Sequence, residues 1–151
     1  MTTQTDKARQ FFNRSISYDT NFVHAWFGFG HSFAQKDEHD SALAAYTTAA
    51  RLAIRSHLPL LYMGKEYLRL NDLVAAEQFL VQAKEIAPRD ALTLNELGVL
   101  YLRTGNLGAA KTNLERAIEL DPSNPDLENT YVNLGHTYRK LKYVVRTRLC
   151  D

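Results

Sequence analysis

The chain has 151 residues, of which 45% are hydrophobic, and its 18 basic and 17 acidic residues give a formal net charge of +1. Because the charges balance and form no long run, we expect no nucleic-acid-binding surface, which would appear as a basic stripe. The length is enough for a sizeable core, and no apolar run reaches the ~18 residues that a membrane span requires.

A period of 34 residues organises most of the chain. When Val23, His57 and Ala91 are taken as position 1 of three units, position 8 is glycine in each unit. Position 11 is aromatic, position 24 is bulky, and positions 20 and 27 are alanine. In unit order these residues are Gly30, Gly64, Gly98; Phe33, Tyr67, Tyr101; Tyr46, Leu80, Leu114; Ala42, Ala76, Ala110; and Ala49, Ala83, Ala117.

In chain order, the period predicts the second helix of a partial unit in residues 7–22 and complete units in 23–56, 57–90 and 91–124. The first helix of a further unit is expected in 128–142, and 143–151 is an atypical tail. Projected backwards, positions 20, 24 and 27 fall on Ala8, Phe12 and Ser15. Projected forwards, positions 4, 7, 8 and 11 fall on Tyr131, Leu134, Gly135 and Tyr138. We therefore expect a segment of a longer solenoid.

Each unit is predicted to form two antiparallel helices. Apolar residues recur at helical spacing, and the small residues at positions 8, 20 and 27 let two helices approach closely. Position 15, between the helices, holds Asp37, Asn71 or Gly105, which tolerate a left-handed backbone. Pro59 suits a first helical turn. Since one pair cannot bury its own apolar face, neighbouring pairs must stack.

A 34-residue period with these residues, and with Pro88 and Pro122 at position 32, resembles the tetratricopeptide repeat. The resemblance implies an all-α fold: a right-handed solenoid of stacked antiparallel helix pairs, here with about eight helices.

Few residue groups suggest chemistry. The run Asp37–Asp40, with His31 and His57, contains metal-ligating types, but it occupies an interhelical turn where Asp40 is placed to cap the second helix. The lone cysteine, Cys150, cannot form an internal disulfide, which fits a reducing compartment, and it lacks a base and a structured pocket. We expect no enzymatic activity, no cofactor and no metal.

In the repeat family, positions 2, 5, 9 and 12 of the first helices line the concave face. Several of these positions are apolar here, and an exposed apolar strip usually marks a partner site. Packing against the next repeat explains any single residue equally well. The candidate partner-binding residues are His24, Phe27, His31, Leu58, Leu61, Lys65, Leu68, Leu92, Asn95, Val99, Leu102 and His136.

The groove lacks the clamp that chaperone adaptors of this repeat family use to bind a terminal carboxylate. The clamp positions, which hold Lys, Asn and Arg in those proteins, are Phe27, His31, Tyr62, Leu92 and Glu96 here. We therefore expect an apolar or amphipathic protein segment as the guest.

A second resemblance rests on residues that the repeat itself does not require, among them His31, Ser32, His57, Pro59, Tyr62 and Glu66. The runs that contain them, and Asn133–His136 with Arg139–Lys142, resemble the sixth-subunit family of the anaphase-promoting complex, a multi-subunit ubiquitin ligase. The resemblance covers residues 7 to about 142. It implies a non-catalytic scaffold in cell-cycle control, located in nucleus and cytoplasm.

By the same resemblance, the partners are other protein subunits of the ligase. They include a small accessory subunit, whose amino-terminal segment the later repeats embrace. The family homodimerises through amino-terminal repeats, and we expect that interface to be absent from this chain. Two alternatives remain open: a free peptide-binding adaptor of the co-chaperone or trafficking type, and the targeting module of a larger enzyme.

Overall fold

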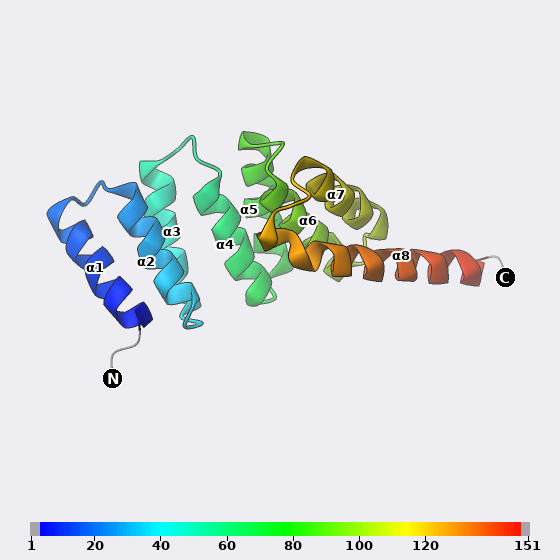
Figure 1. Ribbon diagram of the computed structural model, residues 1–151, viewed down its shortest axis with the longest axis horizontal. Coiled ribbons are helices and arrows are strands. Elements are labelled where there is room, and N and C mark those ends of the chain that lie inside the picture. Colours follow the sequence, from blue (N-terminus) through cyan, green and yellow to red (C-terminus); the bar gives the residue numbers. More distant parts are fainter. Residues whose placement is uncertain (1–3, 149–151) are drawn as a thin grey trace.

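The computed structural model describes residues 4–148, which form eight α-helices and one short 3-10 helix (Figure 1). Within this range there is no strand, as the 34-residue period predicts. The helices are α1 (Gln4–Tyr18), α2 (Val23–Ala34), α3 (His39–Leu52), α4 (Leu58–Arg69), α5 (Leu73–Ile86), α6 (Ala91–Thr104), α7 (Leu107–Leu120) and α8 (Glu128–Arg148), with the 3-10 helix at Pro125–Leu127.

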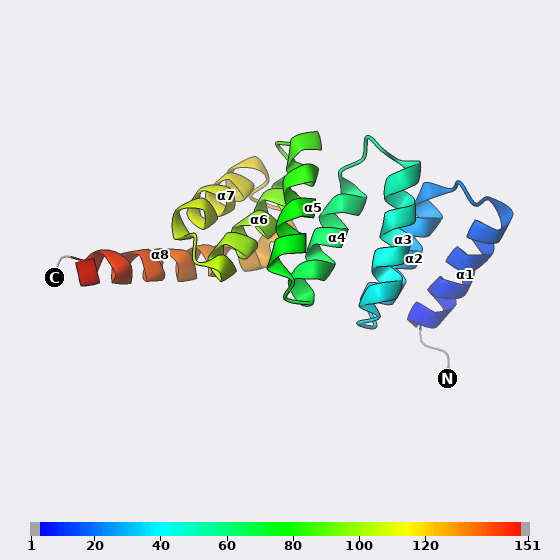
Figure 2. The same ribbon diagram turned by 180° about the vertical axis from the view of Figure 1, so that it is seen from behind.

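The helices stack in chain order as antiparallel pairs. The pairs α2–α3, α4–α5 and α6–α7 pack together, α1 packs on α2, and α8 packs on α7. Helices α2 and α4 are nearer the viewer in Figure 1. In Figure 2, which shows the molecule from the opposite side, α3 and α5 are nearer. The predicted all-α stack of helix pairs is confirmed. No helix in the described range is long and apolar enough to cross a membrane.

The two helices of each complete pair approach closely at the glycine in position 8. A Cβ added to Gly30 would lie 2.5 Å from the Tyr46 ring, and one added to Gly64 would lie 2.6 Å from Cγ of Leu80. A Cβ added to Gly98 would lie 2.5 Å from Cγ of Leu114. Position 8 is therefore glycine because the side chain at position 24 fills the space that a Cβ at position 8 would occupy.

The turns within the pairs have the predicted left-handed residue at position 15. The φ angles are 58° at Asp37, 60° at Asn71 and 82° at Gly105. Asn and Asp tolerate this conformation better than other non-glycine residues.

Several helix starts are capped by side chains. The carboxylates of Asp72 and Asp90 and the amide oxygen of Asn106 accept hydrogen bonds from amides in the first turns of α5, α6 and α7. The expectation for Asp40 is wrong: the N-cap residue of α3 is Glu38, without a side-chain cap bond, and Asp40 lies inside the first turn.

The main core lies between the second and third pairs. It comprises Leu61, Leu68, Ala76, Leu80, Ala83, Leu97 and Leu100. These residues come from α4, α5 and α6, so the largest apolar cluster joins two units instead of filling one.

The last helix is longer than the others. Helix α8 has 21 residues and continues past residue 142, where the predicted helix ends, to Arg148 without a break. In both views it extends beyond the stack (Figures 1 and 2). The rest of the atypical tail, including Cys150, lies outside the described residues.

Candidate partner-binding groove

The predicted groove residues differ in how much surface they present. Leu61, Leu68 and Asn95 are buried; Phe27, His31, Lys65, Leu92, Val99 and Leu102 are partly buried; His24, Leu58 and His136 are exposed. Their location on α2, α4, α6 and α8 follows from the repeat.

Three of these residues pack between units instead of facing a partner. Leu61 and Leu68 belong to the core cluster that α4 shares with α6. The buried Asn95 amide oxygen accepts a 2.7 Å hydrogen bond from the hydroxyl of Thr130 on α8. Position 5, which holds Leu61 and Asn95, is thus covered by the following unit. Val132, at position 5 of α8, is 57% exposed.

An aromatic cluster forms the part of the groove between α2 and α4. The ring of Phe27 lies 4.5 Å from that of His31 and 5.1 Å from that of Tyr62, and His31 and Tyr62 are 4.4 Å apart, all measured between centroids. All three contacts are edge-to-face, the geometry that aromatic quadrupoles favour. Tyr62 was not among the predicted groove residues.

A hydrogen bond connects this cluster to the second helix of the pair. The Tyr46 hydroxyl lies 2.8 Å from Nδ1 of His31. Burial, followed by the charge of Lys65, lowers the pKa of His31, while Glu66 opposes them. Burial also raises the pKa of Tyr46. Both side chains are therefore neutral near pH 7, and the hydrogen bond joins two uncharged groups.

A cavity of about 290 Å³ lies between α4 and α6. It is lined by Lys65, Leu68, Arg69, Glu96, Val99 and Arg103. Within it, Nζ of Lys65 is 3.5 Å from a carboxylate oxygen of Glu96 and 5.3 Å from the Tyr62 ring centroid. Burial raises the pKa of Glu96, and the Lys65 charge partly offsets this effect. The site thus combines an apolar wall with one ion pair.

The charged residues beside the groove attach one unit to the next. The Glu66 carboxylate is 3% exposed and contacts Nδ1 of His39 at 2.7 Å and Nη1 of Arg69 at 3.2 Å. Arg69 also donates to the carbonyl of Ala34 at 2.9 Å. Arg103 makes the equivalent bond to the carbonyl of Leu68.

Sequence reasoning missed the two arginines among these charged residues. Arg69 and Arg103 both occupy position 13, one residue beyond the last groove position that we considered. Their identity in two consecutive units was the available signal. Glu96 was considered only as a clamp position, at position 6 of the third unit, and not as a member of an ion pair.

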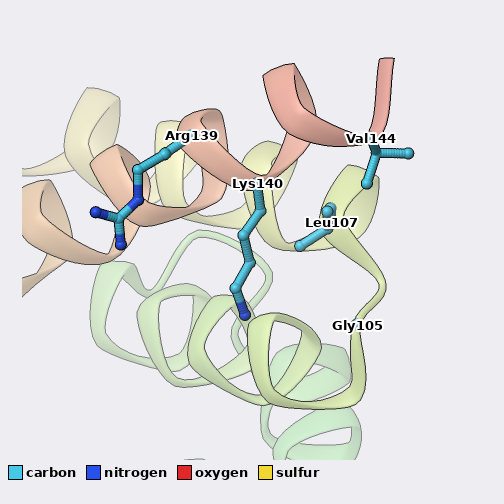
Figure 3. A pocket seen from close by; sticks show the side chains of 5 residues that line it. All are labelled: Gly105, Leu107, Arg139, Lys140 and Val144. Carbon is cyan, nitrogen blue, oxygen red and sulfur yellow. The ribbon is translucent and has the colours of Figure 1, made fainter. Parts of the chain in front are cut away.

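A second cavity, of about 380 Å³, lies at the other end of the molecule beside α8. It is lined by Gly105, Leu107, Arg139, Lys140 and Val144. Figure 3 shows the Lys140 side chain extending from α8 toward α6, whose C-cap residue is Gly105. The predicted groove residue His136 accepts, through Nδ1, a 2.9 Å hydrogen bond from Arg139. This cavity is not part of the predicted groove.

Metal binding receives no support from the geometry. Within residues 4–148, no three His, Cys, Asp or Glu side chains converge as a metal site would require. His39 contacts the carboxylate of Glu66, which belongs to the next helix pair.

Comparison with known proteins shows which proteins the chain is similar to. The tetratricopeptide repeat family matches residues 91–124, the third unit of the period. A 138-residue stretch is 44% identical to anaphase-promoting complex subunit 6 of Arabidopsis thaliana, covering 90% of this chain and 25% of that protein. A 140-residue stretch is 40% identical to anaphase-promoting complex subunit cut9 of Schizosaccharomyces pombe, covering 90% of this chain and 21% of that protein.

A solved structure is similar over nearly the same range. The crystal structure of the APC/C hetero-tetramer Cut9–Hcn1 superposes with a TM-score of 0.88 at 38% identity, covering 93% of this chain and 28% of that chain. The match therefore spans between 21% and 28% of the length of these three chains.

Proposed function

Because the chain belongs to the subunit 6 family of the anaphase-promoting complex, with homology over nine-tenths of its length, we propose that it is a non-catalytic scaffold segment that binds another protein of that complex. The similarity to these relatives confirms the resemblance that residues such as Tyr62 and Glu66 indicated. The proposal places the chain in the nucleus and cytoplasm, where it takes part in cell-cycle control.

The groove between α2, α4 and α6 is the proposed binding surface. The observation that carries this assignment is the cavity between α4 and α6, where the apolar Val99 lies beside the Lys65–Glu96 ion pair. Together with the half-buried rings of Phe27 and Tyr62, it offers apolar anchoring points next to groups that can fix the register of a bound segment.

The guest that fits this surface is an apolar or amphipathic protein segment. The five positions where a carboxylate clamp would require Lys, Asn or Arg include Phe27, Leu92 and Glu96. By the family resemblance, we propose the amino-terminal segment of the small accessory subunit as the guest. Hcn1 is the partner in the hetero-tetramer with Cut9.

Isothermal titration with two synthetic peptides tests the proposal. One peptide is the amino-terminal segment of the small accessory subunit, and the other is an acidic chaperone tail. The 151-residue chain should bind the first and discriminate against the second. Preference for the acidic tail would favour an adaptor and contradict the scaffold proposal.

A groove variant tests whether the peptide binds in the groove. Val99→Asp with Lys65→Glu places two carboxylates beside Glu96 and removes the positive charge of Lys65, and we expect affinity to fall by about tenfold or more. Leu61→Asp is unsuitable because Leu61 is buried and the change would unfold the chain. The matched control is Val74→Asp on α5, whose side chain is exposed. Equal binding by the folded groove variant would place the site elsewhere.

A further inference from the structure

The cavity between α4 and α6 is lined by more positive than negative charges. Its lining consists of the basic Lys65, Arg69 and Arg103, the acidic Glu96, and the apolar Leu68 and Val99. A cleft with low-dielectric walls focuses the field of the charges that line it, so an unbalanced charge there attracts an ion of opposite sign. What the cavity can bind therefore depends on which of its basic residues already have a carboxylate partner.

Two of the three basic residues have such partners within the chain. Nζ of Lys65 lies 3.5 Å from Oε1 of Glu96. Arg69 contacts the carboxylate of Glu66, at position 10 of its own unit, and that of Asp37, at position 15 of the unit before. The charges of Lys65 and Arg69 are therefore balanced by the protein itself.

Arg103 occupies the same repeat position as Arg69 but lacks the two carboxylates. Like Arg69, it donates to a main-chain carbonyl of the preceding unit, that of Leu68. The two positions that supply carboxylates to Arg69 hold Leu100 and Asn71 around Arg103, and neither side chain is charged. In the part of the chain that the structure describes, the Leu68 carbonyl is the one polar partner of Arg103. Its positive charge is thus left unbalanced.

The guanidinium of Arg103 is held in place and still has donors to offer. One nitrogen, Nη1, donates to the Leu68 carbonyl, whereas a guanidinium carries several further N–H donors, and the residue is exposed. Val99 lies four residues earlier on α6, one helical turn away on the same face. Glu96 lies seven residues earlier, about 10 Å along the helix axis. The unbalanced charge therefore adjoins the apolar wall and is well separated from the carboxylate of the cavity.

We propose that this cavity binds the side-chain carboxylate of a glutamate or aspartate within the guest segment, with the acidic group on Arg103 and its methylene groups against Val99. The inference rests on the proposed function, because the guest lies on this groove. A guanidinium fork matches the two oxygens of a carboxylate. A terminal carboxylate fits less well, since the Lys, Asn and Arg side chains with which clamp proteins surround it are absent. The guest then combines apolar residues, for Phe27 and Tyr62, with one acidic residue for Arg103.

An NMR titration with small probes tests the inference without the guest. The α-amide of N-acetylglutamate has a side-chain carboxylate, the α-amide of N-acetylglutamine has no carboxylate, and N-acetylglutamine has a terminal carboxylate alone. At low ionic strength, where screening is weak, the Nε–Hε signal of Arg103 should shift and saturate with the first probe only. The signals of Arg69 and Arg116, which already have carboxylate partners, are internal controls. No saturating shift at Arg103, or an equal shift with N-acetylglutamine, would overturn the proposal.

Calorimetric titration with the guest peptide measures the same contact in the groove. The peptide is the amino-terminal segment of the small accessory subunit, used unchanged and with every Asp and Glu replaced by Asn and Gln. Arg103→Gln should weaken binding of the unchanged peptide by about fivefold to tenfold and leave binding of the amide peptide as it was. Arg116→Gln removes an exposed cation on α7, outside the groove, and should alter neither affinity. Equal losses for both peptides in Arg103→Gln would contradict the contact.

A second variant separates the charge of Arg103 from its bond to the preceding unit. Arg103→Lys keeps the charge without the guanidinium fork, so its affinity for the unchanged peptide should lie between those of the unmodified chain and Arg103→Gln. Circular dichroism confirms that the variants remain helical. An affinity of Arg103→Lys no higher than that of Arg103→Gln would show that the charge does not bind the guest.

The inference and the proposed function fail in different ways. A peptide that does not bind the unmodified chain contradicts the proposed function, whereas the probe titration still decides whether Arg103 binds a carboxylate. A peptide that binds with an affinity unaffected by Arg103→Gln contradicts this inference and leaves the groove as the binding surface.

Discussion

The amide oxygen of Asn95 on α6 accepts a 2.7 Å hydrogen bond from the hydroxyl of Thr130 on α8, and both side chains are buried. The bond joins the third unit to the start of the next. It also explains why a polar residue occupies a position that holds Leu61 one unit earlier. A buried amide is acceptable only when its hydrogen-bonding groups are satisfied.

Thr130→Val should destabilise the chain by about 1–3 kcal/mol, because it leaves the Asn95 oxygen buried without this donor. Adding Asn95→Leu should restore part of the loss, since the acceptor that Thr130 leaves unsatisfied is then removed; Glu96 loses the Asn95 donor but keeps its ion pair with Lys65. Urea unfolding of the two single variants and the double variant gives the coupling free energy. Strictly additive losses would show that the bond contributes nothing to stability.

Gly64→Leu should cost about 1–3 kcal/mol or more, because the new Cβ would overlap the Leu80 side chain and force α4 and α5 apart. Gly108→Leu on α7 serves as the control, since its Cβ meets open space. Thermal unfolding followed by circular dichroism compares them. Equal melting temperatures for the two variants would contradict the close approach at position 8.

Arg69→Leu should destabilise the chain by about 1–3 kcal/mol, because the buried Glu66 loses a cationic partner and the Ala34 carbonyl loses a donor. Arg116→Leu is the comparison: its ion pair with Glu119 is exposed and worth about 0–1 kcal/mol. Chemical denaturation measures both. A larger loss in Arg116→Leu would mean that Arg69 does not attach the first two units.

Acidification should destabilise the first unit through His31. The pKa of His31 is lower in the folded protein, mainly because of burial, so the unfolded chain binds its proton at a higher pH. The stabilising contribution is intact above the unfolded pKa of about 6.5 and is lost as the pH falls below it. The unfolding free energy of His31→Asn should therefore depend less on pH between about 5 and 7 than that of the unmodified chain.

Other titrating groups cancel in this comparison. The raised pKa of Glu96 favours the folded state at lower pH, but it acts equally in both proteins. Identical pH profiles for the two chains would show that His31 is not held neutral.

The sequence was sufficient for contacts that repeat in every unit. Gly64 against Leu80, and the left-handed residue Asn71, recur at fixed offsets, and each is required by backbone geometry. The period therefore predicted the helix pairs and their turns.

The groove was harder to predict, because burial there depends on how one unit rotates against the next. Leu58 and Leu61 are both apolar and lie on the same helix, yet only Leu61 is covered. A repeat pattern defines a helix face without stating how far the neighbouring unit overlaps it. The buried Glu66 likewise depends on His39, 27 residues earlier, and no offset in the period pairs them.

The bonds from Arg69 and Arg103 to the preceding unit end on main-chain carbonyls. Every residue carries such a carbonyl, so the accepting position can change its side chain and keep the bond; it is Ala34 in one unit and Leu68 in the next. An arginine at position 13 can therefore form this hydrogen bond with the preceding unit, whatever side chain that unit has at position 12. Duplication of such a unit would produce a joined solenoid at once, and the copies could then diverge without coming apart.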